Sequence, residues 1–272
     1  MRLAIRHHTE YAYAAGIAGS VQYLRLWPRD EATQTTVRWR LDAPGPVTPW
    51  RDGFGNLVHT VVLSGGTDSL VLTVEGEVDT AETHGILPLD ERGPPLAAYL
   101  RATPPTAADA GLADFAAGFA AQRERGTLPA LHALMTAIHH TVAPLPGDGD
   151  GSDGETTAAQ ALVRGAGCCR DHAHLFIACC RLWGVPARYV SGYLHTQAED
   201  GRTLATHAGA EAEVEYLGWV SFDPSNCQSA TQAYVRLAVG FDYHGAAPVR
   251  GVRLGGGGEQ MRVRRQVMEA EQ

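Results

Sequence analysis

The fold of this chain is decided by the stretch GAGCCRDHAH at residues 165–174, which leads from a glycine-rich turn into an apolar helix. We expect the helix to begin at Cys169 and to end near Trp183, since Gly184 supplies a C-terminal cap and Pro186 prevents continuation. Cys169 then lies in the first turn. The free N–H groups and the positive end of the helix dipole there favour a thiolate and can bind an oxyanion.

Strand-like segments follow this helix, and they bring two further reactive side chains with them. The segments cover residues 188–194, 208–216 and 218–223. His207 opens the second segment and Asp223 closes the third, where Pro224 ends the pairing. Because a hairpin of this length brings Asp223 back level with His207, we expect the carboxylate to orient the imidazole.

The three side chains predict a catalytic triad of Cys169, His207 and Asp223. In this interpretation Cys169 is the nucleophile, His207 is the general base and then the acid, and Asp223 orients His207. A thiolate, an imidazole and a carboxylate can break and remake an acyl bond without a metal or a cofactor. We therefore expect neither.

Other cysteine and histidine residues offer alternatives to this interpretation. Cys168 is a rival nucleophile, although it precedes the helix, and Cys179 and Cys180 are typical small buried residues. Cys168 and His172 are four residues apart, which permits a zinc site, but His172 and His174 point apart on a helix. We expect His174 to donate a buried hydrogen bond instead.

The acidic segment 143–155 has the Asp148, Asp150, Ser152 spacing of a calcium-binding loop. Asp153 stands where such a loop needs glycine, and Ala159 stands where it needs glutamate. We therefore expect an acidic loop without calcium.

The rest of the chain is divided by its hydrophobic patterns. Residues 1–83 alternate in period two, as at Leu70, Leu72 and Val74, and predict an antiparallel β-sandwich-like module. Residues 84–106 form a proline-rich connector. Residues 107–272 hold the core, with two amphipathic helices first and strands at the C-terminal end. The fold class is α+β.

Composition limits the function classes. The 272 residues include 44% hydrophobic and 19% charged residues, with a net charge of −8, so we expect a globular protein and no nucleic-acid partner. We see neither a signal peptide nor an apolar run long enough for a membrane span. An odd number of cysteines, five, fits a reducing compartment. The expected location is cytoplasmic, with no membrane partner.

Four sequence motifs of this chain resemble those of a known family. They are GCCRDHAH at 167–174, GVPARYVSGY at 184–193, THA at 206–208 and GWVSFDPSN at 218–226. Together they resemble the core of the bacterial transglutaminase-like superfamily. Residues 2–79 resemble the β-sandwich region that precedes this core in many bacterial members, and the segments 238–243 and 247–252 resemble its closing part.

The resemblance implies a papain-like α+β core and the same three site residues. The family commonly has tryptophan where this chain has Gly209, and an aromatic or apolar residue where it has His172. We expect a cysteine-dependent acyl-transfer enzyme that acts on peptides or proteins through a thioester. Hydrolysis is the preferred reaction; transamidation by the same triad and an inactive peptide-binding module remain alternatives.

Overall fold

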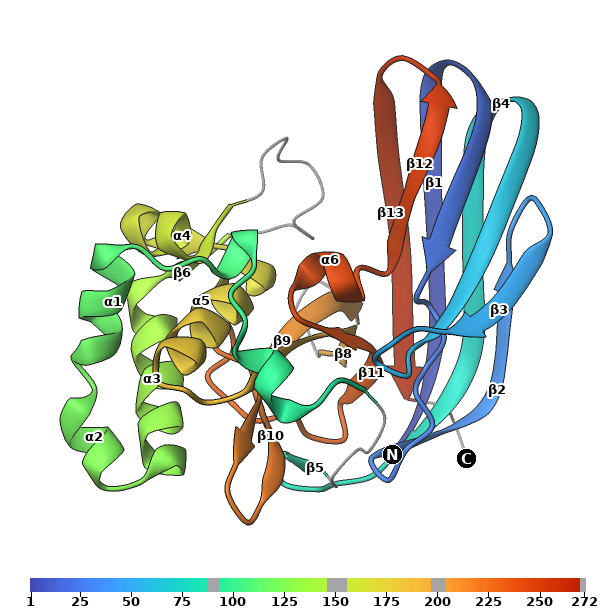
Figure 1. The fold of residues 1–272 in the computed structure, drawn as a ribbon. Coiled ribbons are helices and arrows are strands. Elements are labelled where there is room, and N and C mark those ends of the chain that lie inside the picture. Colours follow the sequence, from blue (N-terminus) through green and yellow to red (C-terminus); the bar gives the residue numbers. More distant parts are fainter. Residues whose placement is uncertain (88–92, 146–155, 197–203, 270–272) are drawn as a thin grey trace.

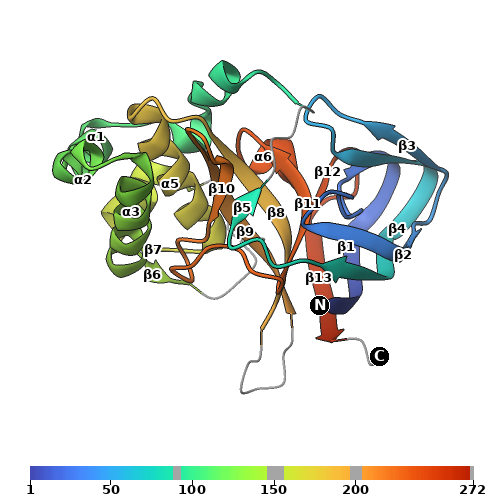
Figure 2. The ribbon, with the colours of Figure 1, turned by 90° about the horizontal axis from the view of Figure 1, so that it is seen from below.

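The computed structural model describes residues 1–87, 93–145, 156–196 and 204–269, without the side chains of residues 204, 205, 259 and 263–269. A five-stranded sheet lies in the middle of the molecule, with the helices on one face and a second, six-stranded sheet on the other (Figures 1 and 2). This arrangement confirms the mixed α+β class with a β-rich module at the N-terminus.

The helical layer contains α1 to α5, and it confirms the expected amphipathic pattern. Its elements are α1 (Ala110–Ala117), α2 (Ala120–Glu124), α3 (Thr127–Thr141), α4 (Ala158–Arg164) and α5 (Cys169–Leu182). The predicted apolar stripe on α3 is buried from Leu131 to Ile138. Two short 3-10 turns, η1 (Leu96–Leu100) and η2 (Pro104–Thr106), precede this layer, and α6 (Tyr243–Ala246) follows the central sheet.

The central sheet is antiparallel throughout and has the strand order β11-β8-β9-β10-β5. Its strands are β5 (Ile86–Leu87), β8 (Ala187–His195), β9 (Leu204–Val214), β10 (Gly218–Phe222) and β11 (Tyr234–Gly240). A short parallel pair, β6 (Ala143–Pro144) and β7 (Ala166–Gly167), leads into α5. The buried face of α5 packs on the alanines of β9, so the helix that carries Cys169 is fixed on the sheet.

The N-terminal module is one six-stranded antiparallel sheet, and its order is β12-β1-β4-β2, with β13 on β1 and β3 on β4. Its strands are β1 (Arg2–Leu24), β2 (Gln34–Asp42), β3 (Val47–Arg51), β4 (Leu57–Thr80), β12 (Val249–Gly255) and β13 (Glu259–Glu269). The last two strands therefore return to the first one. The domain boundaries at residues 83 and 106 remain a prediction. However, β12 and β13, which lie in the segment that we assigned to the core, are hydrogen-bonded to β1 of the N-terminal module.

The second layer that completes the sandwich is the central sheet. Buried side chains of β1 and β4 share one apolar cluster with Tyr193, Val235 and Leu237 of the core. The alternation predicted at Leu70, Leu72 and Val74 is confirmed, since these side chains are buried. Val37 is exposed because a register shift between Thr36 and Arg38 interrupts the alternation of β2.

Buried polar contacts fix the two sheets to each other. Arg236 of β11 forms ion pairs with Glu31 of the N-terminal module and with Glu211 of β9. The Asn56 amide donates to the carbonyl oxygen of Val239 at 2.8 Å. Because removing one partner of a buried ion pair costs about 3–5 kcal/mol, these contacts hold the N-terminal sheet in one position against the core.

Candidate active site

The first turn of α5 is shaped by its neighbouring glycine and acid. The backbone N–H of Cys168 donates to Oδ2 of Asp171 at 2.9 Å, which satisfies a free N–H at the helix start. A Cβ atom at Gly167 would lie 2.7 Å from the Cβ of Asp171, so only glycine leaves room for this contact. The run Gly-Cys-Cys-Arg-Asp thus places Cys169 as the first residue of the helix.

The two adjacent cysteines have different surroundings. Cys168 is 8% exposed, and burial, with a smaller effect of Asp171, raises the pKa of its thiol to about 11. Cys169 is half-buried and lines a pocket together with His207. Burial also raises the pKa of Cys179 to about 12 and that of Cys180 further. Cys168, Cys179 and Cys180 are therefore neutral thiols at neutral pH.

His207 and Asp223 are brought together by the hairpin of β9 and β10. Nε2 of His207 lies 2.7 Å from Oδ2 of Asp223, and Cys169 is also a hydrogen-bond partner of the His207 side chain. The strand register pairs Phe222 with Ala210, so Asp223 follows opposite Gly209 and reaches His207 diagonally. His207 lies inside β9 rather than at its start, because the strand begins at Leu204.

The carboxylate of Asp223 accepts hydrogen bonds from a turn and from the neighbouring strand. The side chains of Ser225 and Asn226 donate to its two oxygens at 2.7 Å each, and their backbone N–H groups donate to Oδ1. The Tyr234 hydroxyl donates to Oδ2 at 2.7 Å, and it accepts in turn from the Gln228 amide. These contacts fix the carboxylate in the orientation that meets His207.

Sequence reasoning missed Tyr234, which stands on β11, eleven residues beyond Asp223. Ser225 and Asn226 belong to the quoted DPSN motif, and a polar turn after aspartate is a usable signal for such contacts. No comparable pattern surrounds Tyr234, since its hydroxyl reaches Asp223 only through the tertiary packing of the sheet.

The electrostatics of the pair favour a protonated imidazole. Burial lowers the pKa of His207, but the hydrogen bonds to Asp223 and Cys169 and their charges outweigh it and raise this pKa to about 10. Burial raises the pKa of Asp223, but the bonds from His207, Tyr234 and Ser225 hold it well below its usual range. Asp223 is therefore a carboxylate beside an imidazolium over the neutral pH range.

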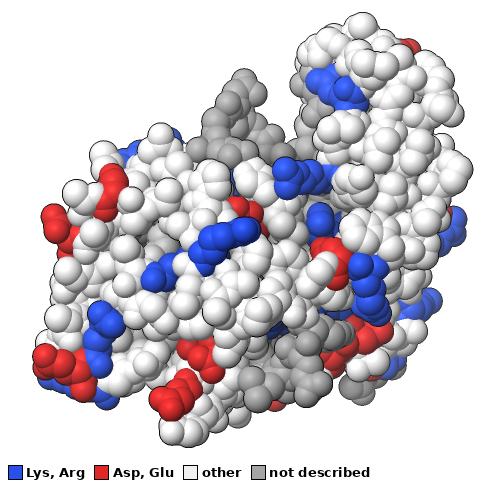
Figure 3. Space-filling view, in the orientation of Figure 1, with Lys and Arg blue, Asp and Glu red and all other residues white. Residues whose placement is uncertain are grey.

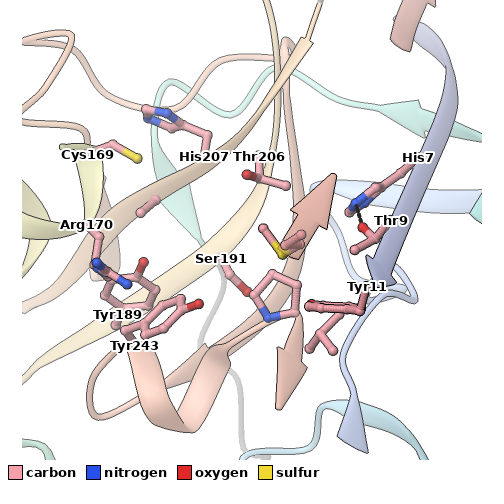
Figure 4. A pocket seen from close by; sticks show the side chains of 14 residues that line it. His7, Thr9, Tyr11, Cys169, Arg170, Tyr189, Ser191, Thr206, His207 and Tyr243 are labelled. Atoms are coloured by element: carbon pink, nitrogen blue, oxygen red, sulfur yellow. Dashed lines mark hydrogen bonds between the residues drawn. The ribbon is translucent and has the colours of Figure 1, made fainter. Parts of the chain in front are cut away.

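The pocket at Cys169 lies between the core and the N-terminal sheet. Figure 4 shows Cys169 beside the His207 ring, with Arg170, Tyr189 and Tyr243 grouped below them. The opposite wall comes from the N-terminal module. The lining residues of that wall are His7, Thr9 and Tyr11 of β1, Val249 of β12 and Met261 of β13. The N-terminal sheet thus forms one side of the pocket. The sequence patterns did not indicate this role.

A second pocket lies on the other side of the His207–Asp223 pair. Its apolar lining includes Leu87, Phe222 and Val235, and Gly209 is part of it. Gly209 does not line the pocket at Cys169. Gly209 is therefore part of the second pocket, so the tryptophan that the family commonly has at this position is missing from that pocket and not from the pocket at Cys169.

Several other candidate residues have structural contacts. Both ring nitrogens of His172 lie 2.9 Å from backbone carbonyl oxygens, those of Cys168 and Val142, so neither faces a metal site. Nε2 of His174 accepts from the Tyr243 N–H at 3.0 Å rather than donating, and burial lowers the pKa of His174 to about 3.

Within the described residues, no group of three or more histidine, cysteine or acidic side chains is arranged to hold a metal ion. Asp148, Asp150 and Ser152, the residues of the calcium comparison, lie outside the described residues. In the part of the chain that the structure describes, no helix is both long and apolar enough to span a membrane. On the face in Figure 3, acidic and basic side chains are interspersed.

Comparison with known proteins identifies the chain. Residues 3–79 match the bacterial transglutaminase-like N-terminal region, and residues 114–224 match the transglutaminase-like superfamily core. The chain belongs to the bacterial transglutaminase-like superfamily. The second match contains all three predicted triad positions and ends one residue after Asp223.

Relatives of this superfamily member cover nearly its whole length. An uncharacterized protein of Mycobacterium leprae is 26% identical, with 96% of each chain covered. An uncharacterized protein of Mycobacterium tuberculosis is 29% identical over 92% of this chain and 87% of its own. The crystal structure of a candidate cysteine protease from Cytophaga hutchinsonii has a TM-score of 0.77 at 18% identity, and covers 100% of this chain and 91% of its own. That likeness shows the fold.

Proposed function

We propose that this protein is a cysteine-dependent hydrolase of peptide or amide bonds, with Cys169, His207 and Asp223 as its catalytic triad. The observation that supports this most directly is the contact chain from Cys169 through His207 to Asp223, at the mouth of a pocket. The neighbouring thiol of Cys168 is buried and neutral, so it does not compete.

The raised pKa of His207 changes the order of its roles. With a pKa of about 10, the imidazole already holds a proton at neutral pH, and it lies beside the sulfur of Cys169. The thiolate of Cys169 attacks the substrate carbonyl carbon, and the oxygen takes the negative charge near the N–H groups of the first turn of α5. His207 then acts first as the acid, giving its proton to the leaving amine.

The second half of the reaction regenerates the enzyme. The C–N bond breaks and leaves a thioester on Cys169, while His207 has become neutral. His207 takes a proton from water as the water oxygen attacks the thioester carbon. The C–S bond then breaks, a carboxylic acid leaves, and the thiolate–imidazolium pair is restored.

The lining of the pocket favours water over a lysine as the acceptor. The described residues that form it include one arginine and no aspartate or glutamate. A protonated amine has no counter-charge in such a pocket, whereas the hydroxyl groups of its walls can bind water. Transamidation remains the competing outcome, because its triad chemistry is the same.

The test is trapping of the acyl-enzyme. Purified protein is incubated with a peptide library in heavy-oxygen water, with and without a primary amine, then quenched in acid and analysed by mass spectrometry. Hydrolysis predicts an adduct on Cys169 and one heavy oxygen in the released acid. An amine adduct as the main product would establish transamidation instead.

Two single variants identify the nucleophile. Cys169→Ala should remove the adduct and lower turnover by about 10⁴-fold or more, as for other nucleophile deletions. The matched control Cys168→Ala should keep the adduct, since that thiol is neutral and buried. No adduct in the wild-type protein with any substrate of the library would support the inactive binding module.

A further inference from the structure

The residue after the nucleophile, Arg170, places a positive charge inside the pocket. It is half-buried, lines the pocket together with Cys169, and its guanidinium carbon lies 4.6 Å from the centre of the Tyr243 ring. Figure 4 shows it beside the rings of Tyr189 and Tyr243, on the side of the pocket that faces away from β1.

Arg170 differs from the other enclosed arginines of the molecule. Four of them pair with carboxylates, namely Arg25, Arg29, Arg188 and Arg236. A fifth, Arg181, donates to four oxygen acceptors. Among the described residues, Arg170 has neither a carboxylate nor an oxygen acceptor within hydrogen-bond distance, and its contact is the face of Tyr243.

The N–H groups of Arg170 can therefore donate hydrogen bonds to a ligand. A guanidinium carries five N–H groups in a planar fork, and a carboxylate matches two of them at once. Partial burial removes water from the charge, which makes a paired anion favourable there. A phosphate site gathers several cationic donors with free N–H groups. The described lining of this pocket has one arginine, and its second cation, the imidazolium of His207, is already hydrogen-bonded to Asp223 and Cys169, which suits a single carboxylate.

We propose that Arg170 binds a carboxylate of the substrate, so that the preferred amides carry an acidic group close to the bond that is cleaved. This inference rests on the proposed hydrolase function. Arg170 and Cys169 line the same pocket, so a carboxylate held by Arg170 stands near the carbonyl that Cys169 attacks.

The Tyr243 ring is itself held in place for this role. The backbone N–H of Tyr243 donates to Nε2 of His174, which stands on α5 one turn beyond Arg170. The deep burial of His174 keeps its imidazole neutral, with a pKa of about 3, so the acceptor lone pair persists over the working pH range. The arginine and its aromatic platform are thus both fixed to the nucleophile's helix.

The first test uses two alkylating agents that differ in charge, iodoacetate and iodoacetamide, and measures their rates with Cys169. Arg170 should favour the carboxylate reagent. In Arg170→Gln the ratio of the iodoacetate rate to the iodoacetamide rate should fall about tenfold, the effect expected for a hydrogen bond to a charged group. The imidazolium of His207 also attracts iodoacetate, but it is present in both proteins and leaves the change in ratio intact.

A matched control removes an equal charge elsewhere. Arg125 is exposed after α2 and lies outside the pocket, so Arg125→Gln should leave the ratio unchanged. Arg170→Lys keeps the charge without the fork and should retain an intermediate ratio. An unchanged ratio in Arg170→Gln, with iodoacetamide labelling intact, overturns the carboxylate site and leaves the hydrolase proposal standing. If neither reagent labels Cys169 in the wild-type protein, both the carboxylate site and the hydrolase proposal are overturned.

The second test distinguishes two sources of the carboxylate. Matched peptides carry aspartate or glutamate, or their amides, beside the scissile bond, and each is offered with a free or an amidated C-terminus. Selectivity for an acidic side chain that Arg170→Gln removes assigns that side chain. Selectivity for the free C-terminus assigns the terminal carboxylate. Equal rates for all of these peptides contradict the proposal.

Discussion

His207 separates two pockets of opposite character. The pocket on the Cys169 side is lined by Arg170 and by hydroxyl groups from both sheets. The pocket on the Gly209 side is mainly apolar, and its polar groups already have partners, as Glu211 has in Arg188 and Arg236. The first can bind a polar substrate, while the second borders the Asp223–His207 contact, in which both side chains are largely buried. The imidazole of His207 thus lines a polar pocket on one side and a mainly apolar pocket on the other.

Among changes to the residues that hold His207 in place, the largest effect on the reaction rate is expected for Asp223→Asn. The amide has no negative charge to stabilise the imidazolium, and it can fix His207 in the wrong tautomer. We expect the rate of acyl transfer to fall by about 10³–10⁴-fold, with the fold retained. Steady-state kinetics measures this, and circular dichroism with thermal melting provides the folding control. A loss of less than tenfold would mean that the charge of Asp223 contributes little to the reaction.

The pH profile tests the proton on His207. Its pKa is raised to about 10, so the imidazolium that gives its proton to the leaving amine persists until the pH approaches that value. We expect kcat/KM to decline on the alkaline side with a midpoint near pH 10. A midpoint near the ordinary histidine pKa of about 6.5 would contradict the coupling to Asp223 and Cys169.

The same proton stabilises the fold. Because the folded-state pKa is raised, its contribution is complete below about pH 6.5 and is lost as the pH rises through about 10. Denaturant unfolding of the wild type and of His207→Gln over this range measures it. The difference between the two proteins should shrink as the pH rises.

A smaller effect is expected for Tyr234→Phe. The change removes one of the hydrogen bonds to Asp223 and leaves those from Ser225 and Asn226. A hydrogen bond to a charged group contributes about 1.5–3 kcal/mol, so we expect a loss of roughly 10- to 100-fold in kcat. The alkaline midpoint should also move down, because a less firmly held carboxylate supports the imidazolium less. An unchanged midpoint would show that the Tyr234 hydroxyl does not affect the pKa of His207 and that its side chain contributes only packing.

The smallest effect on the nucleophile is expected for Gly209→Trp. This change fills the apolar pocket, and Gly209→Ala is the matched control, since its Cβ would lie 3.2 Å from the carbonyl oxygen of Phe222. Because position 209 lies outside the pocket at Cys169, iodoacetamide labelling of Cys169 should change by less than about threefold. A large change in labelling would show that the two pockets are coupled through His207.

The sequence was sufficient for the parts of the site that local rules determine. The start of α5 follows from a glycine, an acid and an apolar helix face, and the hairpin follows from two short strands with a tight turn. Arg170 was visible in the same motif, but nothing in the sequence indicated that it lacks a carboxylate partner. That property depends on which side chains the fold brings near it.

The rest depends on contacts between distant segments. Tyr234 reaches Asp223 because β11 pairs with β8, and His7 reaches the pocket because the N-terminal sheet packs on the core. The return of the chain to β1 was also invisible, since the alternating pattern of β12 and β13 specifies a strand but not its neighbour. Long-range pairing was therefore the part that sequence patterns could not supply.

The pairing of β12 and β13 with β1 limits how the N-terminal module and the core can be exchanged between proteins. The first strand of the chain contributes His7, Thr9 and Tyr11 to the pocket, and the last strand contributes Met261. A fragment cut at either module border would lose a wall of the reaction space and expose the edge of a long strand. Recombination that exchanges the N-terminal strands alone would also have to supply matching strands at the C-terminal end, so the two modules can be exchanged only together.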